Sequence, residues 1–157
     1  MYEHKLEQGT TQERTEALAR ESYAAGLNCA ESVYLAFLDA HGLSRDTLCL
    51  ATGFGGGIGG TGHICGAITA AVLALGTQKG RKDPFATEDP AERGRQLRED
   101  IYPLFADLIG EAEAKFGTVS CAELTAEFED FGSPERKLHC QEIVAYCAAL
   151  AARHAAK

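Results

Sequence analysis

Six cysteines are the side chains of this sequence best suited to chemistry. They are Cys29, Cys49, Cys65, Cys121, Cys140 and Cys147. In a reducing compartment, cysteines more often bind metals or undergo redox chemistry than form structural disulfides. The sequence contains no C-x-x-C pair, so nothing local holds two sulfurs within bonding distance. Any site that the cysteines share must be assembled by the fold.

Three of the cysteines follow signals for the start of a helix. Cys29 comes directly after Asn28, and Cys121 directly after Ser120, and each of these caps has a glutamate three residues further on. Cys65 lies in the first turn of the apolar segment that follows a glycine-rich stretch. Backbone N–H groups are unpaired at a helix start and the helix dipole is positive there, which favours the thiolate over the thiol. These three cysteines are therefore predicted to be reactive or ligating.

The remaining cysteines and the histidines carry weaker signals. Cys140 lies about two turns into the last expected helix, and its position alone does not decide its role. Cys49 and Cys147 have apolar neighbours and no cap, so they are predicted to be small core residues. His63 and His139 are interpreted as partly exposed cap and surface residues rather than ligands.

The glycine-rich stretch is residues 53–67, "GFGGGIGGTGHICGA", and it contains the pattern GxGxxG at Gly57, Gly59 and Gly62. A dinucleotide-binding loop needs a strand before the glycines and βα units after them, and neither is recognisable here. A phosphate-binding P-loop would need Lys-Ser/Thr after its last glycine, where this chain has His63-Ile64. No nucleotide is expected.

The elements that must position these residues are all helical. Helices are predicted over 10–26, 28–42, 44–51, 63–75, 89–117 with a kink or break at Pro103, a short segment from Ser120, and a last helix from Ser133. The segment 63–75 is apolar on nearly every face, which is typical of a helix at the centre of a bundle. We expect an all-α fold, a compact bundle of five to seven helices with a glycine-rich loop before a central buried helix. It forms a single domain over 1–157, with residues 1–9 expected to be disordered.

Composition narrows the class of protein. The chain has 157 residues, 45% of them hydrophobic, and a formal net charge of −8, which argues against nucleic acids and anionic membranes as partners. The longest apolar run, 64–76, is too short to span a bilayer, so no membrane insertion is expected. No signal peptide is recognisable, and a soluble cytoplasmic protein is the expectation.

The order of the cysteines resembles a known family. Cys29 is followed by the glycine-rich loop ending in Cys65-Gly66-Ala67-Ile68-Thr69-Ala70, then by Cys121 and Cys140. This pattern, over residues 23–149, is similar to the redox-active C_GCAxxG_C_C family, which is named for four cysteines, the second in a CGAxxG motif. The final motif glycine is Ala70 here. The resemblance implies a small helical bacterial or archaeal redox protein whose family cysteines are Cys29, Cys65, Cys121 and Cys140.

A similar module in some multi-haem cytochromes looks like an iron–sulfur unit, and this gives the leading expectation. The four family cysteines would hold an iron–sulfur cluster for electron transfer, most simply with two irons. The backbone of Gly57, Gly59, Gly62 and Gly66 would pass close to the cluster and direct N–H groups at its sulfurs. The chain has no C-x-x-C-H motif, so no covalent haem is expected.

Three alternatives stay open at this point. The same four cysteines could form a metal-free thiol–disulfide system, or they could hold structural zinc; a third hypothesis is an interaction module whose cysteines belong to the core. An electron carrier is favoured over a substrate-turnover enzyme, because the acidic residues between 92 and 113 fall on the polar faces of one long expected helix. The expected partner is an unidentified redox protein, and a homodimer is left open.

Overall fold

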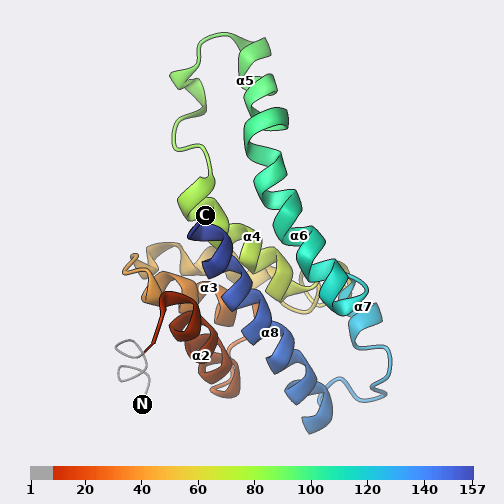
Figure 1. Ribbon diagram of the computed structural model, residues 1–157. Coiled ribbons are helices and arrows are strands. Elements are labelled where there is room, and N and C mark those ends of the chain that lie inside the picture. Colours follow the sequence, from red (N-terminus) through yellow and green to blue (C-terminus); the bar gives the residue numbers. More distant parts are fainter. Residues whose placement is uncertain (1–8) are drawn as a thin grey trace.

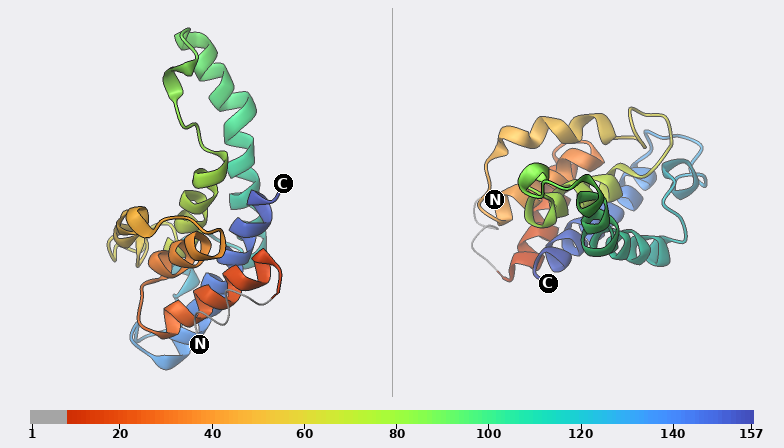
Figure 2. Two further views of the ribbon diagram at one scale, coloured as in Figure 1. Left: turned by 90° about the vertical axis from the view of Figure 1, so that its left-hand side faces the viewer. Right: turned by 90° about the horizontal axis from the view of Figure 1, so that it is seen from above.

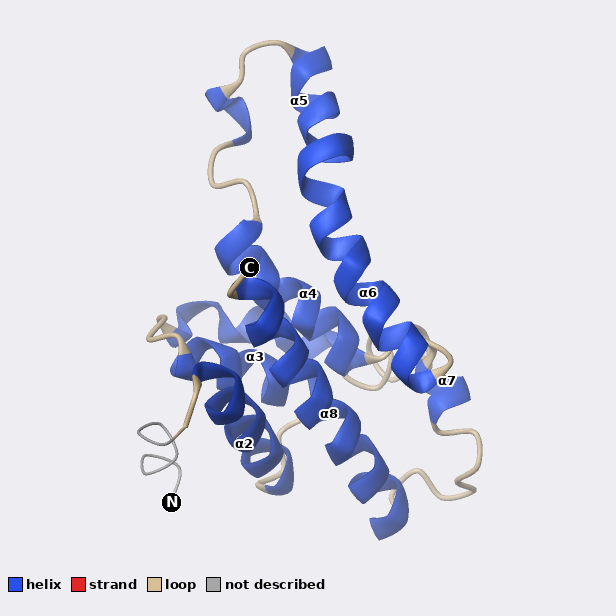
Figure 3. Ribbon diagram, viewed as in Figure 1, coloured by secondary structure: helices blue, strands red, loops and turns tan. Residues whose placement is uncertain are grey.

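We analysed a computed structural model of the protein, in which residues 9–157 are described. The expectation of disorder for residues 1–9 concerns a segment of which all but Gly9 lies outside the described residues. The described residues form seven α-helices: α2 (Thr11–Ala24), α3 (Cys29–Ala40), α4 (Gly66–Lys79), α5 (Pro90–Gln96), α6 (Tyr102–Phe116), α7 (Cys121–Leu124) and α8 (Pro134–Ala155). Within the described residues there is no strand, only one isolated bridge between Ile64 and Ser120 (Figure 3). The all-α prediction is confirmed.

Shorter turns connect the α-helices. A 3₁₀ helix, η1, covers Arg45–Phe54 and ends in the glycine-rich loop, and a second, η2, covers Pro84–Ala86. A π-helical segment, η3 (Leu97–Ile101), joins α5 to α6. The predicted break at Pro103 is therefore a change of helical type: the proline has no N–H and its ring crowds the carbonyl four residues back, so the preceding turn widens.

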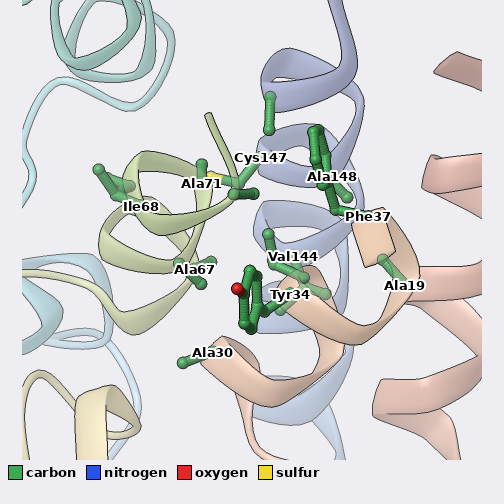
Figure 4. Close-up of a cluster of buried hydrophobic side chains, with 14 of the residues drawn as sticks. Ala19, Ala30, Tyr34, Phe37, Ala67, Ile68, Ala71, Val144, Cys147 and Ala148 are labelled. Atoms are coloured by element: carbon green, nitrogen blue, oxygen red, sulfur yellow. The ribbon is translucent and has the colours of Figure 1, made fainter. Parts of the chain in front are cut away.

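The core lies where α2, α3 and α4 pack against α8 (Figures 1 and 4). The predicted central helix is α4, but it begins at Gly66 rather than at His63, because residues 62–65 are hydrogen-bonded to Val119 and to the first two residues of α7 instead. Its buried face consists mainly of alanines, which allow close approach of neighbouring helices. Ala70, which replaces the glycine of the family motif, is fully buried on this face. The methyl group is accommodated inside the core.

Side-chain caps fix where the helices begin. Thr10 and Asn28 form complete capping boxes with Glu13 and Glu31 at the starts of α2 and α3, as predicted. Ser120 caps α7 by accepting from the Glu123 N–H, whereas the Glu123 carboxylate accepts from Thr118. These caps place Cys29 and Cys121 at the first positions of α3 and α7.

The segment from residue 80 to residue 101, which we call the arm, projects away from the bundle: a loop containing η2 leads outward, and α5 and η3 return (Figures 1 and 2). Every residue from Gly76 to Asp107 is at least partly exposed. The arm therefore extends beyond the main core instead of adding to it. No helix within residues 9–157 is long and apolar enough to cross a membrane.

An ionic cluster joins the end of α8 to α6 and gives a test of this packing. The Glu111 carboxylate accepts from Arg153 and from the buried His154, both at 2.8 Å. The hydrogen bond from Arg153 lowers the pKa of Glu111 below its ordinary value of 4.5. A carboxyl group with a lowered folded-state pKa stabilises the protein at higher pH, and this contribution is lost as the pH falls through the lowered value.

We therefore expect Glu111→Gln to lower the Tm at pH 7 by about 2–4 °C, the shift produced by about 1 kcal/mol in a chain of this length. The two melting curves should converge as the pH falls below 4.5. Thermal unfolding followed by circular dichroism at several pH values measures this. Glu113→Gln, on the exposed side of the same helix, is the matched control. Equal effects of the two substitutions would contradict the prediction.

Candidate functional site

Four of the six cysteines line one pocket of about 650 Å³. They are Cys29, Cys65, Cys121 and Cys140, and we call their site the cysteine pocket. Its lining includes residues of the first turns of α8, and Figure 1 shows that this end of α8 points away from the arm. Cys29 and Cys121 begin α3 and α7, Cys65 is the N-cap residue of α4, and Cys140 lies in the second turn of α8. Four separated segments thus contribute one thiol each.

Backbone hydrogen bonds fix two of these cysteines beside each other. The Cys65 N–H donates to the Val119 carbonyl at 2.8 Å, and the Cys121 N–H donates to the His63 carbonyl at 2.6 Å. This short antiparallel contact joins the glycine-rich loop to the start of α7. It brings Cys65 close to Cys121, although α4, the arm and α6 separate the two residues in the chain.

Burial controls the protonation of the pocket thiols. It raises the pKa of Cys65 to about 12, and it is also the largest cause that raises the pKa of Cys29 and Cys121. The charges of neighbouring cysteines add to this effect, because the four groups lie close together. The sequence-based prediction that these helix starts favour thiolates is therefore wrong. Desolvation of the charged form outweighs the N–H groups at the helix ends.

The glycine-rich loop lies against the cysteine pocket. The Gly56 N–H donates to the Cys29 sulfur, which acts to lower the pKa of that thiol. A Cβ atom at Gly66 would lie 2.6 Å from the Cys29 sulfur, and one at Gly57 would lie 2.6 Å from the Cys121 Cβ. Gly66 is the first residue of α4 and Gly57 lies in the loop, and at both positions any larger residue would force the neighbouring cysteine or backbone to shift.

The other two glycines that the sequence analysis named, Gly59 and Gly62, lie further from the cysteines. A Cβ at Gly62 would lie 3.3 Å from the Ala122 Cβ, and a Cβ at Gly59 would have nothing within 4 Å. Gly56, which bonds to Cys29, is not part of the GxGxxG pattern. That pattern alone therefore does not indicate which glycine reaches a sulfur.

Arg136 and Tyr23 also line the pocket, and the sequence analysis missed both. The Arg136 guanidinium donates to the Tyr23 hydroxyl at 3.0 Å and to the Cys140 sulfur. Burial acts to lower the pKa of Arg136, but the hydrogen bond to Cys140 and the charges of Cys140 and Tyr23 outweigh it and raise the pKa. Burial, with the charges of Cys140 and Cys29, raises the pKa of Tyr23 to about 12. The spacing of Arg136 and Cys140, four residues on one helix, was the available signal.

The two cysteines outside the pocket differ from each other. Cys147 is fully buried between α8 and α4, as predicted, and burial raises its pKa well above the ordinary value (Figure 4). Cys49 is exposed on η1, so its predicted core role is wrong. The 3₁₀ turns of η1 bury only Ala51, and the apolar neighbours of Cys49 in the sequence do not enclose it.

His63 and His139 are at least partly exposed, as predicted. His63 is exposed and bonds to the Thr61 hydroxyl, and the half-buried His139 bonds to the Leu124 carbonyl at 2.9 Å. Across residues 9–157, no three His, Cys, Asp or Glu side chains are gathered closely enough to hold a single metal ion. Zinc holds its thiolates at about 2.3 Å, which requires such a gathering. The described residues offer four thiols around a cavity instead.

The exposure of the cysteines predicts their order of alkylation. Under native conditions Cys49 should react with iodoacetamide at least about tenfold faster than Cys147, because only the exposed thiol is accessible without local unfolding. Timed labelling, followed by denaturation, a second isotopic label and peptide mass spectrometry, measures all six sites. In denaturant the six rates should become similar. Native labelling of Cys147 as fast as that of Cys49 would contradict the burial described here.

Comparison with known proteins agrees with this arrangement. A family model described as "Putative redox-active protein (C_GCAxxG_C_C)" matches residues 27–154, a range that includes all four cysteines of the pocket. An uncharacterized protein of Archaeoglobus fulgidus is 35% identical over 125 residues, covering 74% of this chain and 77% of the relative. No solved structure matches significantly.

Proposed function

Because this chain belongs to the C_GCAxxG_C_C family, whose model is described as redox-active, we propose that its cysteine pocket holds an iron–sulfur cluster. The cluster would gain one electron from a reduced partner protein and lose it to an oxidised one, so that the protein acts as an electron carrier. Cys29, Cys65, Cys121 and Cys140 would be the ligands. The observation that carries the proposal is that these four thiols, from four segments, line one cavity.

The chemistry of the donor set supports a cluster. Four cysteine thiolates are the usual ligands of iron–sulfur clusters, and a cluster of several atoms needs more room than a single ion. The raised pKa values of Cys29, Cys65 and Cys121 describe free thiols. Coordination deprotonates a thiol outright, so these values are no obstacle to ligation. The Gly56 N–H donates to the Cys29 sulfur, and such bonds to ligating sulfurs tune a cluster's potential.

A metal-free thiol–disulfide system is the second candidate. It is favoured by the mutual proximity of Cys29, Cys121 and Cys140, each close enough for its charge to act on another. Two thiols would form one disulfide, giving two electrons and two protons to an oxidised dithiol partner protein. The raised pKa values count against it, because the attacking species is the thiolate.

Analysis of protein purified without oxygen separates these functions. Iron, zinc and acid-labile sulfide per chain are measured together with the visible absorption spectrum. Equal amounts of iron and sulfide with a brown colour are expected. Zinc without iron would replace the proposal with a structural site. No metal, together with two thiols that titrate only after reduction, would favour the disulfide system.

The partner follows from the same proposal. With a net charge of −8, the chain would attract a redox protein with a basic docking surface, and this attraction weakens with ionic strength. Rates of electron transfer measured at increasing salt concentrations test this. A homodimer and a cytoplasmic location remain part of the proposal, and size-exclusion chromatography with light scattering tests the first.

A further inference from the structure

Arg136 is a buried cation without a carboxylate partner. The exposed fraction of Arg136 is 8%. Within the described part of the chain its guanidinium bonds to the Phe131 carbonyl, the Tyr23 hydroxyl and the Cys140 sulfur, and to no Asp or Glu. A buried charge without a counter-ion is costly, and natural proteins usually pair it. The position therefore suggests that an anion is present when the protein functions.

The guanidinium is held in a fixed place. Phe131 and Tyr23 accept from it, and it lies 4.0 Å from the centre of the Phe131 ring. Arginine has five N–H donors in a rigid fork, so the bonds to Phe131, Tyr23 and Cys140 do not use all of them, and Arg136 lines the pocket. Its orientation is set by the protein before anything binds.

The wall of the pocket has an unusual charge for this chain. Acidic residues outnumber basic ones, 23 to 15, yet the described residues that line the pocket include Arg136 and Lys137 and no Asp or Glu. The ionisable groups facing Arg136 are Tyr23 and the cysteines.

We propose that Arg136 is the counter-cation of an anionic centre formed on the pocket cysteines, and that its hydrogen bond to Cys140 raises the reduction potential of that centre. This inference rests on the proposed function and deepens it. Removing a fixed positive charge makes the addition of an electron less favourable, so the reduced form loses more stability than the oxidised form. Arg136 is a positioning residue in this sense: it acts through Cys140.

The test compares wild type with Arg136→Met, Arg136→Lys and Arg153→Gln, all reconstituted with iron and sulfide without oxygen. Arg153 lies on the same helix, has a carboxylate partner and does not line the pocket, so it is the matched control. For Arg136→Met we expect the ratio of oxidised to reduced centre at a fixed potential to rise about tenfold, which is about 59 mV for one electron. The control should keep the wild-type potential.

A potential of Arg136→Met within twofold of wild type would overturn the inference while leaving the proposed function intact. If circular dichroism shows that Arg136→Met does not fold, the decision rests on Arg136→Lys. This variant keeps the charge but loses the fork, so a shift of about twofold to threefold is expected, and no shift overturns the inference.

If wild type takes up no iron, the proposed function fails, and the inference is decided by the rate at which iodoacetamide alkylates Cys140 in the reduced, metal-free proteins. The thiolate is the reacting species, so this rate reports an anionic sulfur beside Arg136 without any cluster. A rate for Arg136→Met about tenfold lower than for wild type would support the counter-cation role. Equal rates would overturn it.

Discussion

Replacing Gly66 with alanine should destroy the cysteine pocket's capacity for iron and destabilise the fold by about 1–3 kcal/mol. The new Cβ would lie 2.6 Å from the Cys29 sulfur and 2.6 Å from the Phe54 carbonyl oxygen. The second atom belongs to the backbone and cannot rotate away, so α4, α3 or η1 must move. Because that movement displaces Cys29 from its neighbours, the ligand set is disturbed together with the packing.

Gly76→Ala is the matched control for this substitution. Gly76 lies in the same helix, and a Cβ there would have nothing within 4 Å. Alanine is the better helix former by about 0.5–1 kcal/mol, so this variant should be as stable as wild type or more stable. Thermal unfolding and iron content of the two variants, measured together, give the answer. If Gly66→Ala retained full iron content and stability, the close contact with Cys29 would be contradicted.

Substitution should separate the four pocket cysteines from Cys49 and Cys147 by the iron content of the variants. If the proposed cluster is present, Cys29→Ser, Cys65→Ser, Cys121→Ser and Cys140→Ser are each expected to lower iron per chain at least about tenfold, because serine replaces one of its four proposed thiolate ligands. Cys49→Ser should leave iron content and stability unchanged, since this thiol is exposed and outside the pocket. Metal analysis of the six variants after identical anaerobic reconstitution measures the division.

Cys147 needs a different substitution. It is fully buried among apolar side chains, so a serine hydroxyl there would lack a partner. Cys147→Ala should keep the iron and lose about 1 kcal/mol of stability, the cost of a small cavity. If Cys147→Ala lost as much iron as the four pocket variants without unfolding, the assignment of the four ligands would be wrong.

Much of the fold follows from local signals in the sequence. The capping residues Thr10, Asn28, Ser120 and Ser133 predict where α2, α3, α7 and α8 begin, because a cap depends on neighbours within one turn. The same signals place Cys29 and Cys121 at helix starts. Local chemistry is sufficient for these statements, and they are confirmed.

Other properties depend on tertiary packing and could not be predicted in this way. The pKa values of Cys29 and Cys65 are raised because neighbouring helices exclude water from them, which no local pattern reports. The exposure of Cys49 depends on which side of η1 faces the core. The hydrogen bond from Gly56 to Cys29 depends on the course of a loop in which several residues have left-handed backbone angles. The neighbouring GxGxxG pattern does not include Gly56.

The order in which the segments that line the pocket are synthesised affects when the site can be assembled. Three of the four pocket cysteines precede α8, and the fourth, Cys140, is on it. Domains fold as units, and α8 contacts α2, α3, α4 and α6, so the bundle closes only when this last helix docks. Arg136 and Cys140 arrive in the same event, completing the ligands and the counter-charge together. A nascent chain that ends before α8 would offer three pocket thiols without their cation, so the proposed cluster should be acquired only after α8 has been synthesised and has docked.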